Sequence, residues 1–284
     1  MCSILSSMAG AELLGHTIGH YRLERTLGEG AIGIVFAATR ENEELAVKLL
    51  RPEHAPGSTT LARFVREARI AREIDSRHVV PILDFGESNG VTFFAMPVYD
   101  GGSLARKLDE NGPLGIDETL ELAAQLGRGL DELHRRRIVH RDVKPSNVLL
   151  DVSGVAALSD FGLARAADST RLTAEGQILG TAHYLAPELI EGREATIASD
   201  VYALGCVLYE CLTGGPPFAG ASPAAVAFAH LTKEPRDPRE LRAEVPVGVA
   251  EALLLALEKD PAARPTSGTA LARLLHVGHS ASPA

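Results

Sequence analysis

Cysteine is scarce in this sequence of 284 residues, which contains only Cys2, Cys206 and Cys211. Three cysteines cannot all pair with one another, and their spacing matches neither CxxC nor a Cys/His metal-ligand pattern. This scarcity argues against a disulfide scaffold and a structural zinc site, and it favours a reducing compartment. We therefore expect the cysteines to be thiols of the hydrophobic core.

Long hydrophobic runs are missing as well. The most apolar stretches, such as Val201 to Tyr209 and Ala252 to Leu257, are well short of the about 18 to 20 residues that cross a bilayer. Met1 to Leu14 has neither a basic beginning nor a continuous apolar segment, so it does not resemble a secretory signal. These absences predict a cytoplasmic chain without a membrane span.

An excess of basic residues is absent too, because 28 Lys and Arg stand against 37 Asp and Glu, a formal net charge of -9. This balance argues against a nucleic-acid partner, since phosphate backbones attract basic surfaces. The shares of hydrophobic residues (45%) and charged residues (23%) exclude a disordered or collagen-like chain. At roughly 150 residues per domain, the length indicates two packed units or one large domain.

Two parts with different patterns follow a first segment of residues 1–20. Residues 21–99 combine one amphipathic helix, Leu61 to Ile74, with short β-type stretches; the predicted strands are Tyr21 to Leu27, Ile34 to Thr39, Leu45 to Leu50, Val79 to Asp84 and Val91 to Met96. Residues 100–276 are mainly helical; the predicted helices are Leu104 to Leu108, Ile116 to Arg136, Ala198 to Thr213, Ser222 to Leu231, Val247 to Leu257 and Thr266 to Leu275. Residues 277–284 are predicted to form a flexible tail.

Gly28, Gly30 and Gly33 fit the pattern G-x-G-x-x-G. A dinucleotide-binding fold would place these glycines between a strand and a helix, whereas here Gly33 leads into a second strand. The context favours a glycine hairpin over phosphates, because residues without Cβ let backbone N–H groups approach the oxygens closely. An ordinary glycine-rich turn is the alternative, and the motif in isolation does not decide between the two.

Lys48 is the only charge in the apolar centre of its strand, where it follows Ala46 and Val47. A lysine there needs an anionic partner to offset its desolvation. Glu67, on the following predicted helix, is the natural candidate, and an ion pair would direct the ammonium group at a phosphate. Taken separately, each of the two residues is more often a surface charge or a charge satisfied by its neighbours.

Residues 140–147, with the sequence HRDVKPSN, place a carboxylate, cations and an amide between two apolar stretches. Such polar groups between buried segments are typical of a rigid site carried on a loop. The triplet Asp160-Phe161-Gly162 follows, and Asn147 and Asp160 offer hard oxygen ligands suited to Mg²⁺. A triplet of this kind alone is often a chance turn, so its weight comes from order and spacing.

Together these motifs resemble the bacterial eukaryotic-type (Hanks-type) Ser/Thr protein kinase catalytic domain. The resemblance extends from about Tyr21 to Leu275 and includes Ala186-Pro187-Glu188. It implies an α+β, bilobal fold, with a small antiparallel sheet and one main helix in residues 21–99 and a larger, mainly helical lobe in residues 100–276. It also implies transfer of the ATP γ-phosphoryl group to Ser or Thr hydroxyls of proteins in bacterial signalling, including autophosphorylation.

The resemblance assigns the phosphate-handling roles. In this family the strand lysine, here Lys48, holds the α/β-phosphates and pairs with the helix glutamate, here Glu67. Asp142 accepts or orients the proton of the substrate hydroxyl. Asn147 and Asp160 hold the metal ions, Mg²⁺ with Mn²⁺ as an alternative.

The resemblance further implies selectivity for Ser and Thr and a site for the nucleotide. Lys144 would neutralise the transferred phosphoryl group, and Thr181 would hydrogen-bond near Asp142 and Lys144, a pattern similar to that of Ser/Thr-selective kinases. The residues implied for ATP binding are Leu27, Gly28, Glu29, Gly30, Ala31, Ile32, Gly33, Val35, Ala46, Lys48, Met96, Pro97, Tyr99 and Leu149.

The sequence departs from the family pattern at two places. Pro97 stands where many relatives carry an acidic residue, but its carbonyl can still accept a hydrogen bond from the adenine amino group while the Tyr99 N–H donates. Tyr202 replaces the tryptophan that commonly follows the helix aspartate, here Asp200. By the same resemblance Arg264 should pair with Glu188, the last residue of the Ala-Pro-Glu element.

Two other functions share part of this pattern. A catalytically dead kinase fold that acts as a scaffold would usually lack the phosphate lysine, the catalytic aspartate or a metal ligand, and none of these is missing. A small-molecule phosphotransferase with a related fold would share the metal and phosphate residues. Thr181, the Ala-Pro-Glu element and Arg264 argue against it.

The expected partners are ATP, protein substrates with Ser or Thr, and a second copy of the chain in a transient homodimer for autophosphorylation. Thr173 is the candidate site, and Glu175 lies where close relatives often have a second threonine. Because Glu175 would partly mimic a phosphate, we predict that Thr173→Ala lowers turnover without abolishing it. Steady-state turnover of the variant measures this, and an unchanged rate would contradict it.

Overall fold

The structure is a computed structural model that describes residues 10–30, 33–51, 72–161 and 182–281. The described residues divide into two compact units. The first takes its residues from 10–76 and 80–99, and the second from 77–79 and 100–281. Each unit has its own architecture.

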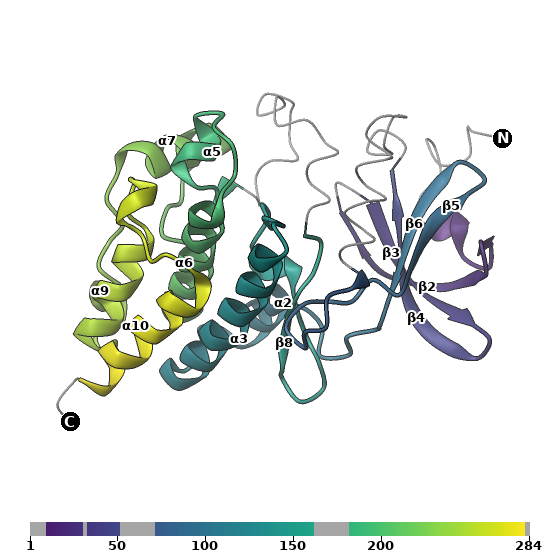
Figure 1. The fold of residues 1–284 in the computed structure, drawn as a ribbon, viewed down its shortest axis with the longest axis horizontal. Coiled ribbons are helices and arrows are strands. Elements are labelled where there is room, and N and C mark those ends of the chain that lie inside the picture. The colour runs from purple at the N-terminus through teal and green to yellow at the C-terminus, as the bar shows by residue number, and fades with distance from the viewer. Residues whose placement is uncertain (1–9, 31–32, 52–71, 162–181, 282–284) are drawn as a thin grey trace. The chain divides into compact units, whose positions relative to one another are not determined.

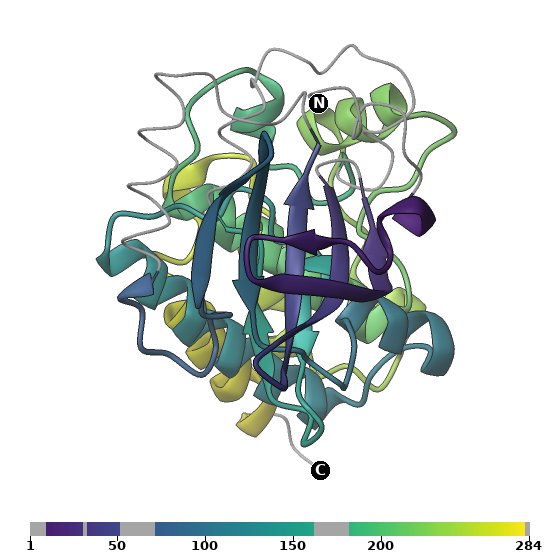
Figure 2. The same ribbon diagram turned by 90° about the vertical axis from the view of Figure 1, so that its right-hand side faces the viewer.

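The first unit is built on a six-stranded antiparallel sheet with the order β1-β2-β3-β4-β6-β5 (Figures 1 and 2). Its strands are β1 (Thr17–Ile18), β2 (Tyr21–Glu29), β3 (Gly33–Arg40), β4 (Glu43–Leu50), β5 (Asp84–Ser88) and β6 (Val91–Met96). The short 3-10 helix η1 (Gly10–Leu13), purple in Figure 2, packs against β2. Glu41 and Asn42 have positive φ and make the tight turn between β3 and β4.

Two predictions for this unit were wrong. Val79 to Asp84 is not a strand, and β5 begins only at Asp84. Pro81 has no N–H to donate to the hydrogen-bond ladder of a sheet. Residues 1–20 do not all precede the sheet, since Thr17 and Ile18 pair with β2 and Ile18 is buried in the core. Most of the predicted helix Leu61 to Ile74 lies outside the described residues.

The second unit is mainly helical, and its helices pack around α6 (Figure 1). α3 and α9 pack on α6, and α10 lies against α3 and α9. The helices are α2 (Leu104–Asn111), α3 (Ile116–Arg135), α5 (Pro187–Ile190), α6 (Ile197–Thr213), α7 (Pro223–Thr232), α8 (Pro238–Leu241), α9 (Val247–Ala256) and α10 (Gly268–Ser280). Two 3-10 helices, η3 (Pro145–Asn147) and η5 (Pro261–Ala263), and a β-hairpin of β7 (Val148–Leu150) and β8 (Ala156–Leu158) complete it. A sheet in one unit and helices in the other confirm the predicted α+β class.

The last helix is longer than predicted. α10 continues to Ser280, so residues 277–280 of the predicted tail are helical. Gly278 suggested a loose end, but it allows close packing instead, because a Cβ there would lie 2.3 Å from the carbonyl carbon of Gly248 in α9. None of the described helices is long and apolar enough to cross a membrane.

The cysteines of α6 are core thiols, as predicted. Cys206 and Cys211 are free and fully buried. Burial raises the pKa of both thiols well above the usual value, so they stay protonated and unreactive at neutral pH. Cys2 lies outside the described residues.

Asp131 of α3 caps the start of α10, and its removal should lower stability. Its carboxylate accepts hydrogen bonds from the Gly268 N–H at 2.9 Å and the Ser267 hydroxyl at 3.2 Å, groups at the unsatisfied N-terminus of the helix. We predict that Asp131→Ala lowers the free energy of unfolding by about 1 to 3 kcal/mol, measured by urea denaturation. The exposed Asp109→Ala in α2 is the matched control, and equal losses in both variants would contradict the capping role.

Candidate active site

Four predicted nucleotide-binding residues share one face of the sheet in the first unit. In the register, Val35 lies opposite Lys48, and Ala46 lies opposite Met96. Directly paired residues point to the same side, and so do residues two apart, such as Ala46 and Lys48. The four side chains therefore lie on one face of the sheet.

The core of the unit lies on the opposite face of the same strands. It is formed by the alternate residues, among them Ile34, Phe36, Ala38, Leu45, Val47, Leu49, Phe93 and Ala95. Lys48 is nevertheless only 6% exposed. A charge this far from water requires compensation, which supports its assignment as a functional residue.

The three glycines of the hairpin differ in their surroundings. A Cβ on Gly33 would lie 2.1 Å from the Leu49 carbonyl oxygen, so this glycine is required by the close approach of β3 and β4. Gly28 and Gly30 have no described atom within 4 Å of a Cβ position. The first two glycines thus leave open space beside the backbone, as a bound phosphate would need.

The other residues predicted to bind ATP lie in or after β2, β6 and β7. Leu27 lies at a bulge, because Thr26 and Gly28 pair with consecutive residues of β3, and its side chain is 39% exposed. β6 ends at Met96, and Pro97 follows with no N–H to continue the ladder. Tyr99 ends the first unit, whereas Leu149 belongs to β7 of the second unit, opposite Ala157.

The second unit brings the catalytic-loop residues together at hydrogen-bond distance. Lys144 Nζ lies 2.8 Å from Asp142 Oδ2, and the Asn147 side-chain amide donates to the same oxygen at 2.8 Å. Asn147 also donates to the Asp142 backbone carbonyl at 2.8 Å. Both side-chain bonds converge on Oδ2, so Asp142 Oδ1 is not used within this group. An oriented carboxylate with one oxygen held and the other spared can take a proton from a hydroxyl.

Ser159, the residue before Asp160, lies next to Asn147 because β7 and β8 pair. Val148 lies opposite Leu158, and one position further the Ser159 N–H and hydroxyl both donate to the Asn147 carbonyl, at 2.8 and 3.0 Å. Asp160 follows with a positive φ of 62°, unusual for a residue other than glycine. Asp160, the second predicted metal ligand, thus follows directly on the residue that is bonded to Asn147.

The donor set of these two residues fits Mg²⁺. The Asn147 amide nitrogen is directed at Asp142, which leaves the Oδ1 atom as its free donor to a metal, and Asp160 supplies a carboxylate. Among the described residues, no group of three or more His, Cys, Asp or Glu could hold a metal by itself. Two protein oxygens are what Mg²⁺ commonly receives when substrate phosphates and water complete its octahedron.

Asp200 of α6 holds the loop of residues 140–142 in place. Its buried carboxylate accepts from the backbone N–H groups of His140 at 2.8 Å and Arg141 at 2.9 Å, and it lies 2.7 Å from His134 Nε2 of α3. Arg141 has a positive φ of 72°, a conformation that these bonds offset. Asp142, the next residue, is positioned by this anchor.

His140 contributes to the same loop as a neutral ring. Burial lowers its pKa, against the raising effect of Asp200. Its Nδ1 can therefore accept the Asp142 N–H, at 3.3 Å. The roles of His134 and Ser159 were missed from the sequence, because a single histidine or serine has no distinctive spacing. His140 lies within the predicted catalytic segment, but its bond to the Asp142 N–H was not predicted.

The ion pair of Glu188 and Arg264, predicted from the resemblance, is present. The two guanidinium nitrogens donate to the two carboxylate oxygens at 2.8 and 2.9 Å, and both side chains are buried. The Ser199 hydroxyl adds a third bond to Glu188 at 2.8 Å. Such bidentate pairing fixes the end of the Ala-Pro-Glu element on α6 and η5.

Several predicted residues lie outside the described part of the chain. They are Glu67, Thr181, Ala31, Ile32, Thr173 and Glu175. Glu29 is described, and it forms an ion pair with Arg51 at 2.6 Å.

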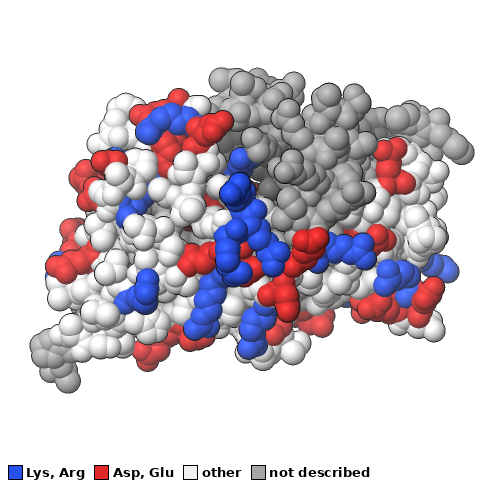
Figure 3. Space-filling view, viewed as in Figure 1, with Lys and Arg blue, Asp and Glu red and all other residues white. Residues whose placement is uncertain are grey.

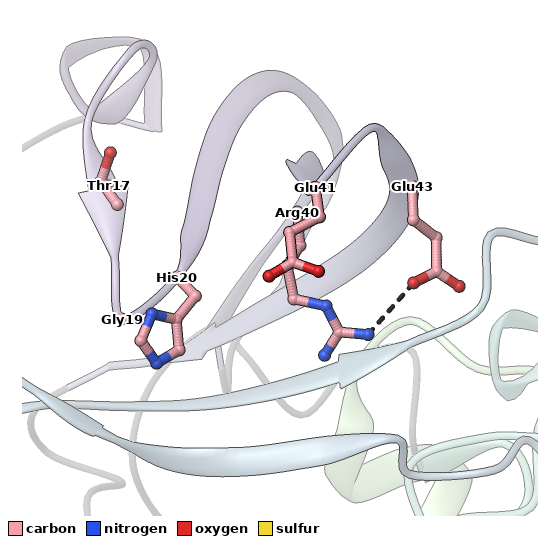
Figure 4. Close-up of a pocket in the computed structure, with 6 residues that line it drawn as sticks. All are labelled: Thr17, Gly19, His20, Arg40, Glu41 and Glu43. Atoms are coloured by element: carbon pink, nitrogen blue, oxygen red, sulfur yellow. Dashed lines mark hydrogen bonds and ion pairs between the residues drawn. The ribbon is translucent and has the colours of Figure 1, made fainter.

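A hollow elsewhere on the first unit has no assigned role (Figure 4). His20 and Arg40 line it, together with Glu43 from the neighbouring strand. Arg40 donates to Glu43 at 3.1 Å and to the Tyr21 hydroxyl at 3.2 Å. Its cation is thus already paired within the sheet.

Basic side chains of the surface are interspersed with acidic ones. Figure 3 shows red atoms beside blue ones at several places, on both sides of a band of blue atoms in the middle of the visible face. In the run Arg135-Arg136-Arg137, Glu132 pairs with Arg135 and, at 2.9 Å, with Arg136. One glutamate balances only one of the three arginines, so the run keeps a net positive charge.

Comparison with known families gives a match to the protein kinase domain over residues 21–275. Among curated proteins, the chain is 40% identical over 266 residues to the serine/threonine-protein kinase PknD of Mycobacterium tuberculosis. It is 38% identical over 252 residues to the serine/threonine-protein kinase PrkC of Bacillus subtilis. These alignments cover 93% and 88% of this chain but only 40% and 39% of the relatives. The chain therefore spans about two fifths of these relatives.

Solved structures agree with the fold. The PknI kinase domain of Mycobacterium tuberculosis matches with a TM-score of 0.76 and 26% identity, covering 96% of this chain and 100% of that one. Rad53 in complex with AMP-PNP matches with a TM-score of 0.75 and 22% identity, covering 90% of this chain and 65% of that one. The latter likeness concerns the fold alone.

The Glu188 ion pair should contribute stability that depends on pH. Burial alone would raise the pKa of the Glu188 carboxyl. The hydrogen bonds from Arg264 and Ser199 have the larger effect together, and they hold this pKa below its usual value. The stabilisation is therefore complete above the ordinary pKa of about 4.3 and is lost as the pH falls through the depressed pKa. We predict that Glu188→Gln lowers the free energy of unfolding by about 3 to 5 kcal/mol at pH 7 and by clearly less below about pH 4.

Urea denaturation at pH 7 and at pH 3.5 measures both values. The exposed Glu251→Gln in α9 is the matched control, and we expect it to change stability little at either pH. The same large loss for Glu188→Gln at both pH values would show that the carboxylate charge is not the source of the stabilisation.

Proposed function

Because the chain belongs to the protein kinase domain family, we propose that it transfers the γ-phosphoryl group of ATP to serine and threonine hydroxyls of proteins, including its own. Bacterial relatives named serine/threonine-protein kinases, at about 40% identity, support this specificity. The single observation that carries the proposal is the group of Asp142, Lys144 and Asn147, joined by three contacts of 2.8 Å. A carboxylate, a cation and a metal-binding amide in one group are what phosphoryl transfer requires.

Each residue of this group has a distinct task in the proposal. Asp142 orients the acceptor hydroxyl and accepts its proton as the oxygen attacks phosphorus. Lys144 is held beside Asp142 and neutralises charge on the phosphoryl group as it moves to the acceptor. Most of the acceleration then comes from positioning and electrostatic stabilisation.

The family pattern assigns the contacts to the nucleotide. Lys48 would contact the α/β-phosphates, paired with Glu67, and the open backbone at Gly28 and Gly30 would lie over the phosphates. Asn147 and Asp160 would hold Mg²⁺, with Mn²⁺ as an alternative. When bound, the metal neutralises charge on the phosphate oxygens.

The substrates and partners of the whole protein are part of the proposal. They are proteins with accessible Ser or Thr and a second copy of the chain, which phosphorylates Thr173 within a transient homodimer. Thr181, close to Asp142 in the family pattern, would select Ser and Thr. The proposed location is the cytoplasm, on the scarcity of cysteine alone.

Radiolabelled ATP tests the activity directly. Purified chain is incubated with labelled ATP, with Mg²⁺ or Mn²⁺, and with a catalytically inactive Asp142→Asn copy as the protein acceptor. We predict that Lys48→Met and Asp142→Asn each lower incorporation by about 100-fold or more, because each removes a group that acts on the transferred phosphoryl or on the acceptor.

The matched control is Lys107→Met, which removes a lysine of α2 that pairs with Glu118 on the surface. We expect its incorporation to equal that of the wild type. Wild-type incorporation that neither Lys48→Met nor Asp142→Asn reduces would refute the assigned roles. Binding of ATP without any transfer would favour a scaffold instead.

A further inference from the structure

A row of neighbouring side chains, which we call the aromatic column, runs through the second unit. It consists of Lys259, Phe218, His230, Tyr202 and Arg264. Lys259 Nζ lies 4.4 Å from the centre of the Phe218 ring, and the Phe218 and His230 ring centres are 4.7 Å apart. The His230 and Tyr202 ring centres are 5.7 Å apart, and Arg264 Cζ lies 4.7 Å from the Tyr202 ring centre. A cation thus lies over the ring at each end of a row of three rings, which meet edge to face or tilted.

The column is attached to both ends of residues 182–188. At one end, His183 Nδ1 donates to the Phe218 carbonyl oxygen at 3.0 Å. At the other end, Arg264 holds Glu188 through the bidentate ion pair. Ala186, between these two attachments, and Ala182, just before them, are both buried.

One hydrogen bond joins the two middle members of the column. The Tyr202 hydroxyl lies 2.7 Å from His230 Nδ1, and both residues are 0% exposed. A buried hydroxyl without a partner is costly, so the tyrosine at this helix position requires an acceptor or donor on α7, and His230 provides it. Burial, reinforced by Lys259, lowers the pKa of His230 to about 3, so the ring is neutral over the working pH range and the bond does not titrate.

We propose that His230 is a positioning residue, which acts through Tyr202 and Phe218 to hold residues 182–188 in the conformation that receives the protein substrate. The inference rests on the proposed function, because the family pattern places Thr181, immediately before this stretch, beside Asp142 and Lys144. A small shift of the backbone at 182–188 would move the acceptor hydroxyl relative to Asp142. The nucleotide site would be left intact.

The test uses three variants and one control. His230→Leu leaves the Tyr202 hydroxyl buried without a partner, and Tyr202→Phe removes that hydroxyl. The double variant replaces both polar groups with apolar ones of similar size, which is far less costly than leaving one unpaired. Tyr209→Phe is the control, since it removes another buried hydroxyl of α6 whose partner, the Arg236 carbonyl, lies outside the column.

Two readouts separate positioning from general stability. The first is steady-state transfer to the Asp142→Asn copy, and the second is hydrogen exchange of the backbone amides of residues 182–190 without substrate. For His230→Leu we expect the KM for the protein to rise about fivefold or more, with the KM for ATP and the rate of ATP hydrolysis by water within about twofold of the wild type. Exchange at 182–190 should accelerate about tenfold.

The double variant should return the protein KM and the exchange rates to within about threefold of the wild type. Should His230→Leu fail to fold, Tyr202→Phe and the double variant provide the same comparison. Unchanged exchange and unchanged protein KM in the variants overturn the proposal. The proposal is also overturned if the variants lose activity only in proportion to their unfolded fraction, and if Tyr209→Phe shows the same loss.

A different result is expected if the proposed kinase function itself is wrong. In that case the wild type itself transfers no phosphate to the Asp142→Asn copy, whatever the exchange rates are. Accelerated exchange in His230→Leu together with an unchanged protein KM would reduce the column to a structural element and overturn the positioning role.

Discussion

The carboxylate of Asp200 is the constraint on which the geometry of the site depends. A buried carboxylate is tolerated only when its oxygens are fully hydrogen-bonded, and here the donors are two consecutive backbone N–H groups of the loop and one histidine of α3. The need to satisfy this charge is what makes the loop adopt one conformation, including the left-handed Arg141. Asp142 inherits its orientation from the packing of α3 against α6, which is far more rigid than a loop.

Three residues in a single turn of α6 contact different parts of the second unit. Ser199 contacts Glu188, Asp200 holds residues 140 and 141, and Tyr202 meets both His230 and Arg264. Because α6 is buried on almost every side, the turn cannot shift without disturbing the core. The same rigid helix, α6, therefore positions both the loop that carries Asp142 and the stretch that ends at Glu188.

The sequence predicted the elements whose patterns are regular and local. β6 has the predicted bounds, α3 and α6 differ from theirs by one residue, and the Glu188 and Arg264 pair followed from a family pattern. The errors arose where local chemistry and tertiary packing disagree: Val79 to Leu83 is apolar but carries Pro81, and Gly278 is a flexible residue used for close helix packing. His134, Ser159 and His230 could not be assigned, because their roles depend on partners 12 to 66 residues away in the chain.

Gly28, Gly30 and Gly33 are not equivalent, so substitutions at the three positions of the hairpin have different effects. At Gly33 even a methyl group would collide with the backbone of the adjacent strand, so a substitution there reports on whether the sheet can assemble. At Gly28 and Gly30 an added methyl group meets no described atom, so a substitution there reports on what the hairpin covers. One motif thus contains two separable kinds of information, and averaging the three positions would conceal both.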